Sequence, residues 1–101
     1  MKYANLIMYS DVQPYEVIRV ISEKTIEIRA MSAELDAEWK PKFDVGGFVG
    51  HCTNQKTQKW IITSSSDPVI RMRKQKNGTW KSIYGRHKLS DEPVKVYDYN
   101  F

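Results

Sequence analysis

The chain has 101 residues, of which 41% are hydrophobic and 28% are charged, and its net charge is +4. These values predict one small globular domain over residues 1–101 and exclude an intrinsically disordered chain, and no apolar run reaches the length that crosses a bilayer. One cysteine excludes an intramolecular disulfide, which favours a cytoplasmic location, and with two histidines it matches no zinc pattern, so we expect no metal and no cofactor. The short apolar run at the N-terminus is interrupted by Asn5 and no small-residue cleavage site follows it, so we expect no signal peptide.

The first predicted element is a β-hairpin. Residues 15–21 and 25–31 are rich in β-branched side chains and flank a short polar connection, which is typical of two paired strands. In the second strand Ile26 and Ile28 share one face, because side chains alternate along a strand. Arg29 therefore projects from the other, polar face of the hairpin.

The middle of the chain is predicted to form a short helix and then a second hairpin. Residues 32–39 combine helix formers with a serine at the N-cap position, and Pro41 closes the segment, which indicates a short helix or turn. Residues 48–52 and 59–63 are strand-like, and we expect them to pair across the loop at residues 53–58.

A third hairpin is predicted in the basic half of the chain. Residues 69–73 alternate apolar and basic side chains, which is typical of a half-buried strand with Arg71 and Arg73 on one face. The Asn-Gly pair at residues 77–78 favours a tight hairpin turn. We therefore expect residues 79–84 to run antiparallel to that strand.

These elements predict a mainly β fold with one short helix. With a closing strand and tail at residues 94–101, the chain has about six short strands at close spacing, which favours a small antiparallel barrel or a strongly bent sheet. Twelve aromatic residues exceed what one small core needs, and a barrel or bent sheet of short strands leaves edges to cover. We therefore expect a homo-oligomer.

The segment at residues 46–60 is the richest candidate site. It holds three glycines, an adjacent His51 and Cys52, and two large aromatics, a composition that suits close backbone approach to a flat, polar ligand. The alternatives are a glycine bulge that enters a strand and a buried cysteine that packs as a small hydrophobe. Since the segment lacks a P-loop lysine and a recognisable nucleophile with its base, we expect binding without catalysis.

Basic residues are concentrated in the second half of the chain. Residues 1–50 carry six Lys and Arg against eight Asp and Glu, whereas residues 51–101 carry ten against four. Between Lys56 and Lys88 there are nine basic residues and one acidic residue, Asp67. Such a field attracts phosphates, although a solvated face that maintains solubility would have the same composition.

The residue types in these segments suit a nucleotide. A base can stack on aromatic rings and bond to amides, and its phosphates can pair with arginines. The predicted ligand-binding residues are Arg29, Gly47, Phe48, His51, Asn54, Gln58, Trp60, Arg71, Arg73, Tyr84 and Arg86. Single-stranded RNA or DNA fits these types equally well, but the modest net charge and the clustering of contact groups at loops favour a small ligand.

The sequence also resembles a known family. The pattern Gly-Gly-Phe-x-Gly-His-Cys-x-Asn-Gln-x-x-Gln-Lys-Trp at residues 46–60, with residues 25–29 before it and the terminal Tyr-Asp-Tyr-Asn-Phe, resembles small proteins of tailed phages and prophages. Among these it is most similar to the first family of phage anti-Thoeris proteins. The resemblance implies a non-enzymatic sponge that captures cyclic ADP-ribose isomers, and in some members cyclic oligonucleotides, as dimers or hexamers in an infected bacterium.

Four functions remain open on the sequence alone. The first is the phage sponge for a cyclic nucleotide signal, and the second is a β-type module that binds single-stranded nucleic acid. The third is a nucleotide hydrolase that uses His51. The fourth is an interaction protein with no pocket. The sequence also leaves open whether residues 97–101 complete the sheet, fill an interface or lie over the pocket.

Overall fold

The computed structural model describes residues 2–44 and 51–99, without the side chains of Asp44 and His51. A 3-10 helix spans Gln55–Thr57. The strands in these residues are β1 (Tyr3–Ile7), β2 (Val12–Gln13), β3 (Tyr15–Ser22), β4 (Thr25–Ala30), β5 (Ser32–Leu35), β6 (Phe43–Asp44), β7 (His51–Cys52), β8 (Trp60–Thr63), β9 (Ile70–Lys74), β10 (Trp80–Ser82) and β11 (Gly85–Ser90).

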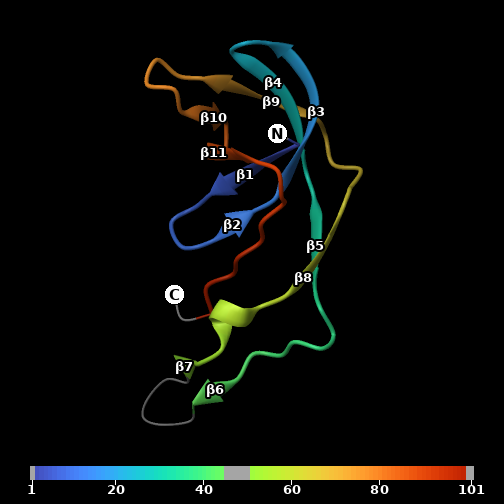
Figure 1. The fold of residues 1–101 in the computed structure, drawn as a ribbon, viewed down its shortest axis with the longest axis vertical. Coiled ribbons are helices and arrows are strands. Elements are labelled where there is room, and N and C mark those ends of the chain that lie inside the picture. Colours follow the sequence, from blue (N-terminus) through green and yellow to red (C-terminus); the bar gives the residue numbers. More distant parts are fainter. Residues whose placement is uncertain (1, 45–50, 100–101) are drawn as a thin grey trace.

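Six of the strands close into an antiparallel barrel (Figure 1). Their order is β11-β10-β9-β4-β3-β1, and β1 returns to pair with β11 from Tyr3 opposite Ser90 to Ile7 opposite Arg86. β2 adds a short strand beside β1. The prediction of a mainly β fold with a small antiparallel barrel of about six strands is confirmed.

The buried cluster inside the barrel is made of side chains from four strands, β1, β3, β4 and β9. On β4 Ile26 and Ile28 face inward and Arg29 faces outward, as the alternation predicts. On β9 Met72 is fully buried opposite Ile26. The buried cluster is Ala4, Leu6, Tyr15, Ile26, Ile28 and Met72.

Two of the predicted hairpins are confirmed. β3 pairs with β4, and β9 pairs with β10 across the Asn-Gly turn. In that turn Gly78 has a φ of +86°, a conformation that favours glycine, and the Asn77 side chain accepts a hydrogen bond from the Thr79 N–H at 3.0 Å.

An extension leaves the barrel after β4 and returns before β9 (Figure 1). Its first part is a two-stranded ribbon of β5 and β8, and its far part holds the pair β6 and β7 beside the 3-10 helix. The extension lengthens the molecule, whose extents are 52 × 28 × 21 Å. No helix in residues 2–44 and 51–99 has both the length and the apolar composition to cross a bilayer.

Of the short helix or turn predicted at residues 32–39, the helix is wrong, and a turn occurs only at its end, where the Trp39 N–H donates to the Asp36 carbonyl at 2.9 Å. Ser32–Leu35 is strand β5, in which Ala33 lies opposite Ile62 and Leu35 opposite Trp60. Local helix propensity is a weak preference, and cross-strand packing of these apolar pairs overrides it here. The pairing predicted for residues 48–52 with 59–63 is also wrong, because β8 pairs with β5 while β7 pairs with β6.

The closing strand predicted at residues 94–101 is wrong within the described residues. That segment makes a single bridge, in which Val12 and Val96 exchange two backbone hydrogen bonds of 3.0 Å. Further backbone groups of the segment bond to side chains, with the Val94 N–H on Asn5 and the Tyr97 N–H on Gln58. The C-terminal segment thus links the barrel to the extension (Figure 1).

Candidate functional site

Part of the predicted glycine-rich site falls outside the described residues. Gly47 and Phe48 lie there, and His51 belongs to β7 with a side chain that is likewise not described. Cys52 is buried, which agrees with its interpretation as a small hydrophobe, and its thiol donates a hydrogen bond to Asn54 Oδ1 at 3.5 Å.

The two amide side chains predicted to bind a ligand are occupied within the chain. Asn54 accepts a hydrogen bond from the Lys42 N–H and donates one to the Lys40 carbonyl, both at 2.8 Å. Gln58 donates from Nε2 to the Tyr97 carbonyl at 3.0 Å and accepts the Tyr97 N–H at 2.8 Å. Both amides therefore stabilise the extension and offer little to a ligand.

Trp60 has a similar structural role. Its indole Nε1–H donates to Gln58 Oε1 at 2.6 Å, and the Lys95 ammonium lies 5.5 Å from the ring centroid. The half-buried ring is thus held between two partners of its own chain.

A different set of predicted residues does come together, on the outer surface of the barrel. Five exposed cations occupy outward positions on three adjacent strands, and we call them the basic path: Arg71 and Arg73 of β9, Lys81 of β10, and Arg86 and Lys88 of β11. At its centre Lys81 lies opposite both Arg73 and Arg86 in the strand register. The path therefore crosses β10 without a gap.

Sheet geometry gives the dimensions of the basic path. Adjacent strands lie about 4.8 Å apart, so the step from Arg73 to Arg86 covers about 10 Å. Because β9 and β11 both run antiparallel to β10, Arg71 and Lys88 extend the path in opposite directions. With about 3.3 Å per residue along a strand, the diagonal from Arg71 to Lys88 is roughly 16 Å.

Acidic groups neutralise one end of the path only. Glu27 forms ion pairs with Arg19 at 2.9 Å and with Arg71 at 3.4 Å. The other four cations of the path have no ion pair within residues 2–44 and 51–99. Their positive field is therefore directed at solvent.

The sequence prediction included three of these five cations and missed Lys81 and Lys88. The sequence does contain a signal for Lys88, because Arg86 and Lys88 repeat the two-residue spacing of Arg71 and Arg73. The spacing indicates a shared face only once residues 85–90 are known to form a strand.

The remaining predicted residues, Arg29 and Tyr84, border the basic path. Arg29 lies on the outer face of β4, two residues beyond Glu27, and its buried Nε has no hydrogen-bond partner among the described residues. Tyr84 lies in the turn between β10 and β11, two residues before Arg86, and is 61% exposed. Tyr84 also lines a hollow of about 160 Å³ together with Tyr15, Asp67 and Pro68.

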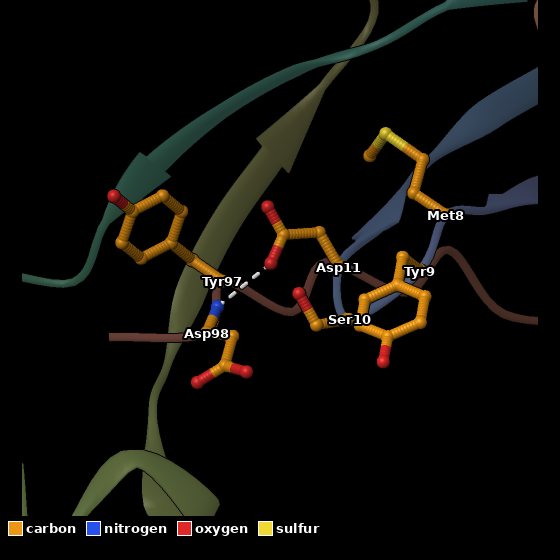
Figure 2. Close-up of a pocket in the computed structure, with 6 residues that line it drawn as sticks. All are labelled: Met8, Tyr9, Ser10, Asp11, Tyr97 and Asp98. Carbon is orange, nitrogen blue, oxygen red and sulfur yellow. Dashed lines mark hydrogen bonds between the residues drawn. The ribbon is translucent and has the colours of Figure 1, made fainter. Parts of the chain in front are cut away.

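A hollow of about 270 Å³ between the β1–β2 loop and the C-terminal segment is a poor phosphate site (Figure 2). It is lined by Met8, Tyr9, Ser10, Asp11, Tyr97 and Asp98. The Asp11 carboxylate accepts the Asp98 N–H at 2.8 Å, and Figure 2 shows this contact across the hollow. Two carboxylates without a cation in the lining repel anions. No group of three or more metal-ligating side chains occurs in residues 2–44 and 51–99.

Comparisons with protein families, curated protein sequences and solved structures found no match to this chain.

A buried serine–histidine pair lies inside the barrel. The Ser82 hydroxyl is 2.8 Å from His87 Nε2, and His87 Nδ1 is 2.9 Å from the Ala4 carbonyl. This carbonyl can only accept a hydrogen bond, so Nδ1 carries the hydrogen and Nε2 accepts the hydrogen bond of the Ser82 hydroxyl. His87 is only 3% exposed, and burial lowers its pKa below 6.5 although the Ala4 hydrogen bond opposes the shift. The pair links β1, β10 and β11, and substrate has no route to the imidazole.

Proposed function

We propose that the protein binds single-stranded nucleic acid along the basic path without catalysing a reaction. The observation that carries the proposal is the uninterrupted register of Arg73, Lys81 and Arg86 on three adjacent strands. A positively charged groove or face that follows a phosphate backbone is the common element of such proteins. The argument that contact groups cluster at loops, which favoured a small ligand, is weakened. The side-chain amides of Asn54 and Gln58 already form hydrogen bonds with the backbone of the chain.

The length and surroundings of the path support this proposal. A stacked strand advances about 3.4 Å per nucleotide, so a path of roughly 16 Å matches about five phosphates. Small β-barrels that bind single strands cover roughly 4 to 16 nucleotides each. Tyr84, which is exposed and lies two residues before Arg86 in the chain, is an aromatic residue on which a base of a bound strand can stack.

Capture of a cyclic nucleotide is the second candidate function. It is favoured by the compactness of Arg73, Lys81 and Arg86, whose span of about 10 Å suits the two phosphates of one small ligand. It is also the function implied by the resemblance to phage anti-Thoeris proteins. Under this candidate the protein acts as a non-enzymatic sponge and a homo-oligomer in the cytoplasm of an infected bacterium, and these properties stay predictions.

A length series separates the two candidates. We expect the affinity for fluorescein-labelled thymidine oligonucleotides to rise steeply from two to about five nucleotides and more slowly beyond, because five phosphates fill the path. Cyclic ADP-ribose isomers and cyclic dinucleotides are expected to compete only weakly. The measurement is fluorescence anisotropy, with native mass spectrometry of the complexes.

The opposite pattern has a clear meaning. If a cyclic nucleotide binds tightly, is released intact on denaturation and is not displaced by oligonucleotides, the second candidate is correct and the first is wrong. Absence of binding to either class would contradict both.

A further inference from the structure

A second hollow lies at the Lys88 end of the basic path. It has a volume of about 250 Å³ and lies over β1, β2 and β11 beside the C-terminal segment. Four aliphatic residues line it, namely Ile7, Val12, Leu89 and Val94. It therefore offers apolar contact at the edge of a cationic surface.

The polar groups of this hollow are largely occupied. Asn5, which also lines it, donates from Nδ2 to the Glu92 carbonyl at 3.1 Å and accepts the Val94 N–H on Oδ1 at 3.0 Å. These bonds fix the C-terminal segment over β1 and leave the amide little capacity for a ligand. A flat ligand group would be held there by van der Waals contact with its faces and edges. The hollow would therefore discriminate little between hydrogen-bonding patterns of different bases.

The hollow and the basic path share residues. Lys88 belongs to the path and also lines the hollow. Ile7, on the opposite wall, is the register partner of Arg86. A group inserted in the hollow thus lies beside Lys88, and Arg86 is on the strand next to Ile7.

We propose that this hollow takes one nucleobase of the bound strand, while Arg86 and Lys88 hold the phosphates on either side of that nucleotide. The inference rests on the proposed function. Two other hollows fit a base less well. The one in Figure 2 is acidic, and one of about 490 Å³ at the hairpin turns is rimmed by Lys24, Lys74 and Lys76 without an apolar wall.

The test combines a filled hollow with a strand that lacks bases. Val94 is 39% exposed, so Val94→Phe adds bulk in the hollow at little risk to the fold, and Val69→Phe, at 38% exposure away from the hollow, is the matched control. The probes are a thymidine pentanucleotide and a pentanucleotide of abasic sites. We expect Val94→Phe to weaken binding of the thymidine pentamer about 5- to 20-fold and to leave the abasic pentamer unchanged.

Each outcome is informative. Equal loss for both probes, or no loss for either, overturns the base site, and so does an equal effect of Val69→Phe. Failure of the wild-type protein to bind the thymidine pentamer or longer strands overturns the proposed function itself, so the two failures are distinguishable. Circular dichroism and the urea midpoint of each variant show that the fold is retained.

Discussion

Lys81→Glu is expected to weaken the binding of a single-stranded oligonucleotide by about 10- to 100-fold. Lys81 lies opposite Arg73 and Arg86, so a carboxylate at this position would lower the charge of the three positions from +3 to +1 and would compete with phosphate for both arginines. The fold is expected to stay intact, because residue 81 faces solvent. The measurement is the dissociation constant for a labelled ten-nucleotide strand at fixed salt.

Lys40→Glu is the matched control for this change. It alters the net charge by the same amount at an exposed residue of the extension, outside the basic path. We expect less than a threefold effect from it, because charges beyond a Debye length of about 8 Å are screened at physiological salt. Equal effects of the two variants would show that net charge, and not the basic path, governs binding.

His87→Ala is expected to lower the free energy of unfolding by about 2–4 kcal/mol. The change leaves a cavity between β1, β10 and β11 and removes the partners of the Ser82 hydroxyl and the Ala4 carbonyl. The Tyr15 ring also loses its edge-to-face contact with the imidazole, at 5.0 Å between centroids. Urea unfolding followed by tryptophan fluorescence measures the loss.

The same histidine predicts a pH dependence with a defined sign. Burial lowers the pKa of His87, so the unfolded chain takes up this proton first, near pH 6.5. The stability of the wild-type barrel should therefore be constant above about pH 7.5 and should fall as the pH drops through 6.5 towards the lowered pKa. Burial raises the pKa of the adjacent Tyr15, which stays neutral throughout this range.

His87→Ala should abolish this fall between pH 7.5 and 5.5, whereas His51→Gln, at the chain's other histidine, should retain it. A fall of unchanged size in His87→Ala would assign the acid sensitivity to other groups.

Local pattern was enough to predict two of the three hairpins. The turn at Asn77 and Gly78 is determined by neighbouring residues, and the alternation around Ile26 and Ile28 determines which face of β4 is buried. The closure of the barrel could not be predicted in this way. β1 and β11 are more than 70 residues apart in the chain, and their pairing depends on the shape of the complete sheet.

The site predictions were least accurate for residue types that suit both ligand binding and a structural role. The side-chain amides of Asn54 and Gln58 are of the type that hydrogen-bonds a base. In this structure they form hydrogen bonds with the backbone of the extension and of the C-terminal segment instead. Ser32–Leu35 shows the same competition, since its helix formers pair with β8 instead. Lys81 joins the predicted arginines only through the register of β10 with β9 and β11, which the sequence alone does not determine.

The salt dependence of strand binding tests the central claim most directly. The dissociation constant of the wild-type protein for a ten-nucleotide thymidine strand would be measured by anisotropy between 50 and 500 mM potassium chloride. Displacement of counterions from about three to five phosphates predicts that the logarithm of the dissociation constant rises with the logarithm of salt with a slope of roughly 2 to 3.5. A slope below about 0.7, which corresponds to less than one phosphate, would contradict binding along the basic path.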